Sequence, residues 1–254
     1  MFHITKNYRN LFNVYWCKKV ENLKIICFIG ARGGSKGVPG KNIRLINGKP
    51  LIAHTIISAL NSGLFNHVIV STEDKTIAKV AKKYGAEVPF LRPKNLATDT
   101  TAFADVMIHG INELKKLGYE FDVLVNRDCT VPFIRIKDMK KSINILKNKK
   151  CNAVFGVYRQ HFNPYFNMME NDSNGFLQLS KKLKNRPTSR QEAPIVYQLN
   201  GIFVYFVDQF LKHKTPLLPK SLAYEMPMEC GLMIDTELEF KIAEMMMEKN
   251  LIPS

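Results

Sequence analysis

The stretch KIICFIGARGGSKGVPGKN, residues 24–42, joins two different kinds of sequence. Its first part, residues 24–30, is a short apolar run rich in β-branched and aromatic residues, which is typical of a buried strand. Its second part, residues 31–42, is rich in Gly and Pro and carries Arg32, Lys36 and Lys41. A strand followed at once by a basic glycine-rich loop predicts a ligand site at the carboxyl end of that strand.

After this stretch, the sequence predicts strands and helices in alternation. Apolar residues at helical spacing predict helices at 51–63, 73–85, 105–118, 136–150 and 236–250, and a Gly marks the C-terminal end of the first three. Runs rich in β-branched residues predict strands at 67–72, 86–91, 122–126, 152–158 and 201–206. This alternation favours βαβ units and therefore an α/β fold, with a mostly parallel sheet flanked by helices.

Two segments fall outside the alternation. Residues 1–23 are interpreted as an N-terminal extension, and residues 24–254 as a single domain. Within that domain, residues 161–200 are rich in Asn, Pro, Tyr and Phe and show no helical period. We interpret them as a small insertion with extra strands, at about 160–200. Its aromatic residues belong either to a partner surface or substrate lid, or to a plain surface loop.

Composition narrows the class of protein. Of the 254 residues, 46% are hydrophobic and 23% are charged, which is ordinary for a globular protein. No run approaches the roughly 18 apolar residues of a membrane span, and the N-terminus lacks the features of a secretory signal. We therefore expect a cytoplasmic protein with no membrane partner. Its five cysteines are scattered and never form C-x-x-C, which argues against a disulfide framework or a zinc site.

The net charge of +15 fits two classes of partner. One is nucleic acid bound by a basic surface, and the other is a small polyanionic substrate such as a nucleoside triphosphate. The lysines are spread along the chain and are not interleaved with aromatics in one block, so no nucleic-acid partner is expected. A steeply salt-dependent affinity for RNA would support the alternative.

The glycine-rich loop suits a triphosphate and its departing pyrophosphate. Glycines lack a Cβ, so their backbone N–H groups approach phosphates closely, and the three basic side chains add positive charge. The loop matches neither G-x-x-x-x-G-K-[ST] nor G-x-G-x-x-G, which excludes the Walker loop and the dinucleotide fingerprint. A flexible basic loop with no ligand is the alternative.

The pattern R-G-G-S-K-G-x-P-x-K-N after the first strand resembles the signature of the acylneuraminate cytidylyltransferases, the CMP-sialic acid synthetase family. The similarity continues, in order, through GKPLIAHTI (48–56), VIVSTED (68–74), GAEVPFLRPKNLATDT (85–100), SRQEAP (189–194), YQLNGIFVY (197–205) and IDTELEF (234–240). It implies a Rossmann-like fold of the nucleotide-diphospho-sugar transferase type with a small dimerisation insertion, and hence a homodimer. It also implies transfer of CMP from CTP to the C2 hydroxyl of a sialic-acid-like nonulosonic acid, with Mg²⁺ required and pyrophosphate released.

The resemblance also implies roles for individual residues. The nucleotide would be held by Arg32, Gly33, Gly34, Ser35, Lys36, Lys41, Asn42, Arg92, Asp99 and Thr100. Asp235 in IDTE would bind Mg²⁺, and it forms the predicted catalytic set with Arg32 and Lys36. On the sugar side, the matching positions are Arg190 and Asn200, and we add Gln198 and His161 as further contacts.

The metal motif departs from the family pattern. Family members usually carry D-x-D, whereas here the first Asp is replaced by Met233. Asp128 stands in NRDCTVPF, where the family usually has Gln-Pro-Thr-Ser-Pro, and we hypothesise that it supplies the missing carboxylate at the nucleotide and the metal. The alternative is a turn residue at a strand end.

The sugar side departs as well. Gln198 replaces an Arg of the sialic acid enzymes, and Phe166 stands where a Lys is expected. Because Gln cannot pair bidentately with a carboxylate, the acceptor is expected to be a legionaminic or pseudaminic type of acid in place of N-acetylneuraminate. Two other functions stay open: a CMP-Kdo type cytidylyltransferase, and an inactive nucleotide-binding homologue, which Met233 and Gln198 favour. A nucleotide other than CTP is also open.

Overall fold

The predicted first strand lies at the heart of the protein. The computed structural model describes residues 22–252, so residues 1–21 of the expected extension lie outside the described part. Strand β1 (Ile25–Gly30) is buried along its length and pairs in parallel with β4 (His67–Ser71) and β5 (Val123–Arg127). Leu23 already packs into the core, so the folded body begins at least one residue before the predicted boundary.

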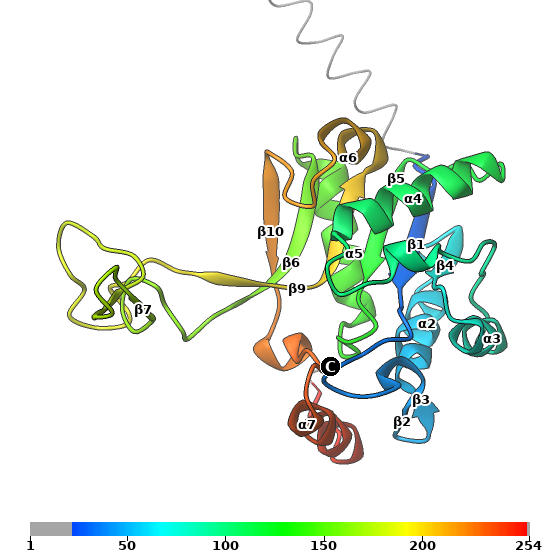
Figure 1. Cartoon of the computed structure of the whole chain (residues 1–254). Coiled ribbons are helices and arrows are strands. Elements are labelled where there is room, and N and C mark those ends of the chain that lie inside the picture. The colour runs from blue at the N-terminus through cyan, green and yellow to red at the C-terminus, as the bar shows by residue number, and fades with distance from the viewer. Residues whose placement is uncertain (1–21, 253–254) are drawn as a thin grey trace, which may run out of the picture.

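The central sheet has six strands in the order β10-β6-β9-β5-β1-β4 (Figure 1). Strand β10 (Ser221–Glu225) runs parallel to β6 (Ala153–Arg159). Only β9 (Tyr197–Phe206) is antiparallel, to β5 on one side and to β6 on the other. The α/β fold with a mostly parallel sheet is therefore confirmed.

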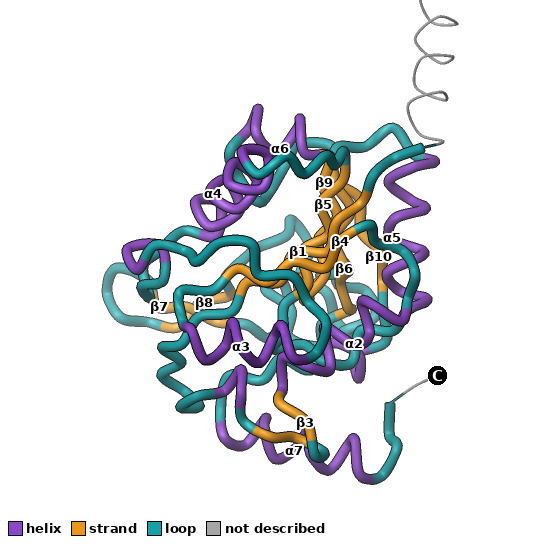
Figure 2. Tube along the Cα trace, turned by 90° about the vertical axis from the view of Figure 1, so that its right-hand side faces the viewer, coloured by secondary structure: helices purple, strands orange, loops and turns teal. Residues whose placement is uncertain are grey.

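Helices cover both faces of the sheet (Figure 2). One face packs against α4 (Phe103–Lys116) and α6 (Val207–His213), and the other against α2 (Leu51–Asn61), α3 (Lys75–Lys83) and α5 (Ile136–Asn148). Successive residues of β1 alternate between the two apolar layers, as the period of a strand requires. None of the described helices is long and apolar enough to cross a membrane.

Helix α5 begins with a buried ion pair. The Asp138 side chain is fully buried and accepts hydrogen bonds from Arg135 and from the Tyr224 hydroxyl. Burial acts to raise the pKa of Asp138, but these hydrogen bonds outweigh it and hold that pKa below its ordinary value. The hydrogen bond from Tyr224 links the start of α5 to strand β10 at the edge of the sheet.

The predicted strand at 86–91 is wrong. This segment makes only an isolated parallel bridge, between Glu87 and Ile69. Pro89 follows two residues later and has no N–H to continue a ladder, so pairing stops there. Several elements were not predicted, among them the short helix α6 and the edge strand β10.

The last helix closes one end of the molecule. Helix α7 (Glu237–Glu248) packs its apolar face on Val38, Ile46 and Phe133, close to the first loop of the chain. Two short strands, β2 (Leu45–Ile46) and β3 (Lys49–Pro50), form a small hairpin beside it. The glycine-rich loop is thereby held between the sheet and α7.

Residues 160–196, between β6 and β9, form an arm that projects from the body (Figure 1). The arm contains the antiparallel pair β7 (Met169–Asn171) and β8 (Leu177–Leu179), which are the extra strands expected there. Several of its apolar side chains are exposed, among them Phe162, Phe176 and Leu177.

Candidate active site

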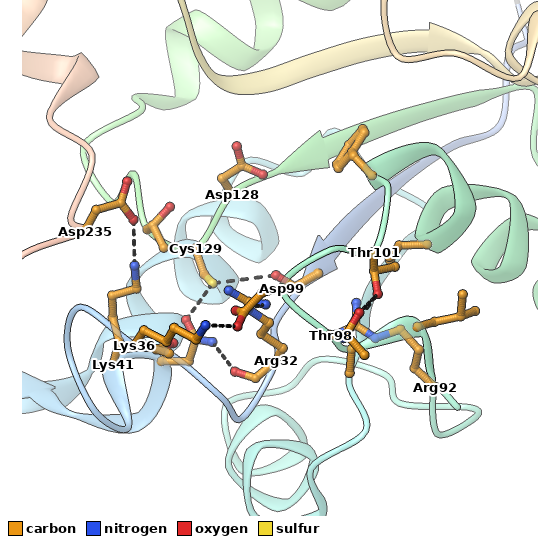
Figure 3. Close-up of a pocket in the computed structure, with 18 of the residues that line it drawn as sticks. Arg32, Lys36, Lys41, Arg92, Thr98, Asp99, Thr101, Asp128, Cys129 and Asp235 are labelled. Atoms are coloured by element: carbon orange, nitrogen blue, oxygen red, sulfur yellow. Dashed lines mark hydrogen bonds and ion pairs between the residues drawn. The ribbon is translucent and has the colours of Figure 1, made fainter. Parts of the chain in front are cut away.

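A cavity of about 720 Å³ lies at the carboxyl ends of β1 and β5, where ligands bind in open α/β sheets (Figure 3). Nine of the predicted residues line it: Arg32, Ser35, Lys36, Lys41, Asn42, Arg92, Asp99, Asp128 and Asp235. The sequence therefore predicted the position of the cavity and most of the charged groups that face it.

The glycine-rich loop is held in shape by a buried amide. Asn42 is only 5% exposed, and its Nδ2 donates to the carbonyl oxygen of Arg32 at 2.8 Å. The thiol of Cys129, at the end of β5, donates to Asn42 Oδ1 at 3.1 Å. Asn42 therefore fixes the path of the loop backbone and contributes to the cavity wall as well.

Lys41 connects this loop to the other end of the chain. Its side chain is nearly buried, and Nζ donates to the carbonyl oxygen of Ile234 at 2.6 Å and to Asp235 Oδ1 at 2.8 Å. The contact is tight at Gly37, where an added Cβ would lie 2.0 Å from the backbone oxygen of Asp235. The predicted metal-binding carboxylate is thus placed directly against the predicted phosphate loop.

The two remaining loop cations share one anion. Arg32 Nη1 lies 2.8 Å from one carboxylate oxygen of Asp99, and Lys36 Nζ lies 2.5 Å from the other. The hydrogen bond from Lys36, together with the charge of Arg32, lowers the pKa of Asp99. Asp99 is one of the residues predicted to hold the nucleotide, and in this structure its carboxylate pairs with two of the cations expected to hold the triphosphate.

Arg92 forms the opposite wall and is paired with a residue that we did not predict. Its side chain is 5% exposed, and Nη2 donates to Glu73 Oε2 at 3.0 Å. The second oxygen of Glu73 accepts the backbone N–H of Gly33 at 2.7 Å. Glu73 lies in the VIVSTED stretch that carried the family resemblance, and this was the sequence signal that pointed to it.

Asp128 faces the same cavity as Asp235. Asn126 Nδ2 donates to Asp128 Oδ1 at 2.8 Å, which orients the carboxylate at the end of β5. Burial raises the pKa of Asp128, and the negative charge of Asp235 acts in the same direction. Within residues 22–252, no group of three or more His, Cys, Asp or Glu side chains is arranged to hold a metal ion by itself.

The other predicted residues do not line this cavity: Gly33, Gly34, Thr100, His161, Arg190, Gln198 and Asn200. Asn200 is fully buried, and both polar atoms of its side chain lack a hydrogen-bond partner. Gln198 is exposed near the base of the arm, where its Oε1 accepts from Gln160 Nε2 at 2.7 Å. The roles predicted for these residues stay predictions.

Several lining residues were not predicted, namely Thr98, Thr101, Phe103, Cys129 and Thr130. Thr98 and Thr101 hydrogen-bond to each other through their hydroxyls at 2.8 Å, in the same loop as Asp99. Thr98, Cys129 and Thr130 lie inside stretches that the sequence analysis singled out, and Thr101 and Phe103 follow one of them. Their membership of these stretches, or nearness to them, was the signal that could have found them.

A mostly parallel sheet with a basic glycine-rich loop and two carboxylates around a cavity at its carboxyl edge is typical of a nucleotidyltransferase of the α/β type. The family model described as Cytidylyltransferase matches residues 26–251. The chain belongs to this cytidylyltransferase family.

Individual relatives agree with this assignment. Post-translational flagellin modification protein B of Campylobacter coli is 38% identical over 237 residues, covering 90% of this chain and 97% of that protein. The CMP-N,N'-diacetyllegionaminic acid synthase of Campylobacter jejuni subsp. jejuni serotype O:2 is 38% identical over 236 residues, covering 91% and 98%. A solved structure of CMP:2-keto-3-deoxy-manno-octonic acid synthetase complexed with CTP has a TM-score of 0.66 at 18% identity and covers 89% of this chain and 99% of that one. This last similarity shows the fold alone.

Proposed function

We propose that the protein transfers CMP from CTP to the C2 hydroxyl of a sialic-acid-like nonulosonic acid and releases pyrophosphate. The observation that carries the proposal is the cavity itself, which is lined by the cations Arg32, Lys36 and Lys41 and by the carboxylates Asp128 and Asp235. The cations suit a triphosphate, and the carboxylates suit a metal-assisted transfer. The family assignment and the relative named for a CMP-legionaminic acid product support the same reaction.

In this reaction the C2 hydroxyl oxygen attacks the α-phosphorus of CTP and releases its proton to solvent, while the bond between the α-phosphorus and the oxygen that bridges to the β-phosphate breaks and that oxygen leaves with pyrophosphate. Arg32 and Lys36 neutralise the charge that grows on the leaving pyrophosphate, since both extend from the loop into the cavity. For this, both side chains must leave the Asp99 carboxylate and contact the phosphates of CTP when the nucleotide binds. We assign Arg92, on the opposite wall of the cavity, to the ribose and base end of CTP.

Mg²⁺ is part of the proposal, with Asp235 and Asp128 as its protein ligands. The donors fit the ion, because Mg²⁺ commonly takes one or two carboxylates together with substrate phosphates and water. Three or more protein ligands are therefore not required, and the described residues contain no such group of His, Cys, Asp or Glu side chains. When bound, the ion polarises the phosphate that is attacked. Lys41 holds Oδ1 of Asp235 and thereby sets the orientation of that carboxylate.

The acceptor proposed is a legionaminic type of acid. Gln198 offers a neutral amide where an Arg is usual, and Gln160 fixes that amide through a 2.7 Å hydrogen bond. An amide recognises acyl-amido substituents through hydrogen bonds without requiring a charge on its partner. Asn200 stands at a position that faces the sugar in the family and is assigned as a second sugar contact, in keeping with an amide that has no hydrogen-bond partner among the described residues.

We also propose a cytoplasmic homodimer that is assembled through the arm. Its exposed apolar side chains, including Phe162, Phe176, Leu177 and Ile195, form a surface that a partner would cover. A stable dimer of this kind buries about 1,200 Å² or more in total. The described cysteines are free thiols, which suits a reducing compartment.

Pyrophosphate release tests the reaction. The purified protein is incubated with CTP, Mg²⁺ and, in separate samples, legionaminate, pseudaminate, N-acetylneuraminate or Kdo. Release with a legionaminic acid, with matching amounts of the CMP-sugar, is the expected result. Turnover of Kdo alone, or CTP binding with no release for any acid, would replace the proposal by one of the two alternative functions.

A further inference from the structure

Glu73 links two parts of the nucleotide cavity without lining the cavity itself. One of its oxygens accepts the Gly33 backbone N–H at 2.7 Å, and the other accepts Arg92 Nη2 at 3.0 Å. Gly33 belongs to the phosphate loop, while Arg92 stands on the opposite wall. A single carboxylate therefore spans the distance between the proposed triphosphate end and the base end of the nucleotide.

The segment that carries Glu73 is held firmly in place. Thr72 is fully buried, its carbonyl oxygen accepts the Arg92 backbone N–H at 2.9 Å, and its hydroxyl accepts the Asp74 N–H at 3.1 Å. Asp74 caps α3 by accepting the N–H groups of Thr76 and Ile77. Glu73 thus projects from a short connection that is fixed at both sides, and it has little freedom to follow either partner.

Both partners depend on this one carboxylate. Arg92 is almost wholly buried and its Nε has no hydrogen-bond partner, so the bond to Glu73 is the main anchor of the guanidinium. At Gly33 an added Cβ would lie 2.7 Å from Asp74 Oδ2, so the backbone of the loop packs closely against the segment that carries Glu73. The N–H of Gly33 is committed to Glu73, which leaves the later amides of the loop for phosphate.

We infer that Glu73 is a positioning residue for nucleotide binding, setting the separation between the phosphate loop and Arg92. The inference rests on the proposed reaction only in naming CTP as the nucleotide. A carboxylate is required because two donors point at it, and each of its two oxygens accepts one of them. The negative charge of Glu73 also balances the positive charge of the buried Arg92 guanidinium.

The decisive variant is Glu73→Gln. Its single amide oxygen accepts from only one of the two donors, and its NH₂ group faces the other donor. We expect the dissociation constant for CTP, measured by calorimetry without sugar, to rise at least about tenfold, as the loss of one charge-assisted hydrogen bond predicts. In turnover, the KM for CTP should rise by a similar factor while the KM for the sugar stays within about twofold. Glu73→Asp keeps the charge that the fold requires but is too short to reach both donors, so it should weaken CTP binding too.

Glu87→Gln is the matched control. Glu87 also bridges two donors, His67 Nδ1 and the Tyr119 hydroxyl, each at 2.8 Å, but at the opposite end of β4 and away from the cavity. It should bind CTP within about twofold of the parent. CTP binding unchanged in both Glu73 variants, or weakened equally in the Glu87 control, would overturn the inference.

The same measurements separate this inference from the proposed function. If the parent protein binds CTP but transfers CMP to no acid, the proposed reaction fails, and the CTP dissociation constants of the variants still decide the role of Glu73. If the parent protein binds no CTP at millimolar concentration, both proposals fall together.

Discussion

Replacing Gly37 by Ala should separate the phosphate loop from Asp235. A Cβ at residue 37 would lie 2.0 Å from the Asp235 backbone oxygen, and Cβ atoms essentially never come closer than 3.0 Å to another heavy atom. The difference, 3.0 − 2.0 = 1.0 Å, is the least by which the two segments must move apart. The backbone itself tolerates alanine here, because the φ of Gly37 is not in the left-handed region.

The expected loss of activity follows from that displacement. A misplacement of about 1 Å in a catalytic group costs about 100-fold in rate, so kcat/KM in the pyrophosphate assay should fall about 100-fold. Overpacking costs about 1–3 kcal/mol in folding free energy, and each kcal/mol lowers Tm by about 2–4 °C in a protein of this size. The Gly37→Ala variant should therefore be folded at 25 °C but poorly active.

Gly34→Ala is the control within the same loop. An added Cβ there meets no atom within 4 Å, and the φ of Gly34 is not in the left-handed region either. Because this glycine belongs to the proposed phosphate loop, the control is one of stability: Gly34→Ala should keep Tm within about 2 °C of the parent, whereas Gly37→Ala should lower it. A Gly37→Ala protein with more than a third of the parent activity would refute the reasoning, as would equal losses of Tm in both variants.

Three further predictions address the metal, the stability and the assembly. Asp128→Asn should abolish Mg²⁺-dependent pyrophosphate release while leaving Tm nearly unchanged, and a fully active variant would remove Asp128 from the metal site. Asp138→Asn leaves Arg135 without its buried partner, and urea unfolding at pH 7 should show a loss of about 3 kcal/mol or more. Because the pKa of Asp138 is lowered by folding, this difference is fully present above the unfolded value of about 3.9 and is lost as the pH falls through the lower folded value; a difference that does not shrink as the pH is lowered below about 3.9 would contradict it. Phe176→Asp, in the arm and 70% exposed, should convert a dimer to a monomer in light scattering, whereas Leu238→Asp, 68% exposed on α7, should not.

The parts of the fold with strong periodicity could be predicted from the sequence. Strand β1 is a continuous apolar run and α3 has a sharp apolar stripe that ends at Gly85, and both were found within two residues of their predicted limits. Helix α6 has only 7 residues, too few to display a helical period, and β10 is an edge strand whose side chains are mostly not buried. Such elements owe their conformation to neighbours that are distant in sequence, as the pairing of β10 with β6 illustrates.

In the candidate site too, some features could be predicted from the sequence and others depend on contacts between distant segments. Residues carried by one contiguous motif, such as Arg32, Lys36 and Asn42, were predicted and do line the cavity. The contacts that fix their geometry join separate motifs, and spacing within a motif carries no information about them. Glu73 with Arg92 and Gly37 with Asp235 are of this kind, and only the fold brings each pair together.

The salt bridge between Lys41 and Asp235 joins residues that are 194 positions apart. During translation at about 5–20 residues per second, about 10–40 s separate the synthesis of the two. A nascent chain that has not yet reached α7 therefore already contains its phosphate loop but still lacks Asp235. With the role proposed for Asp235, turnover requires the segment that carries it, so chains that terminate before residue 235 have the loop without the carboxylate that completes it.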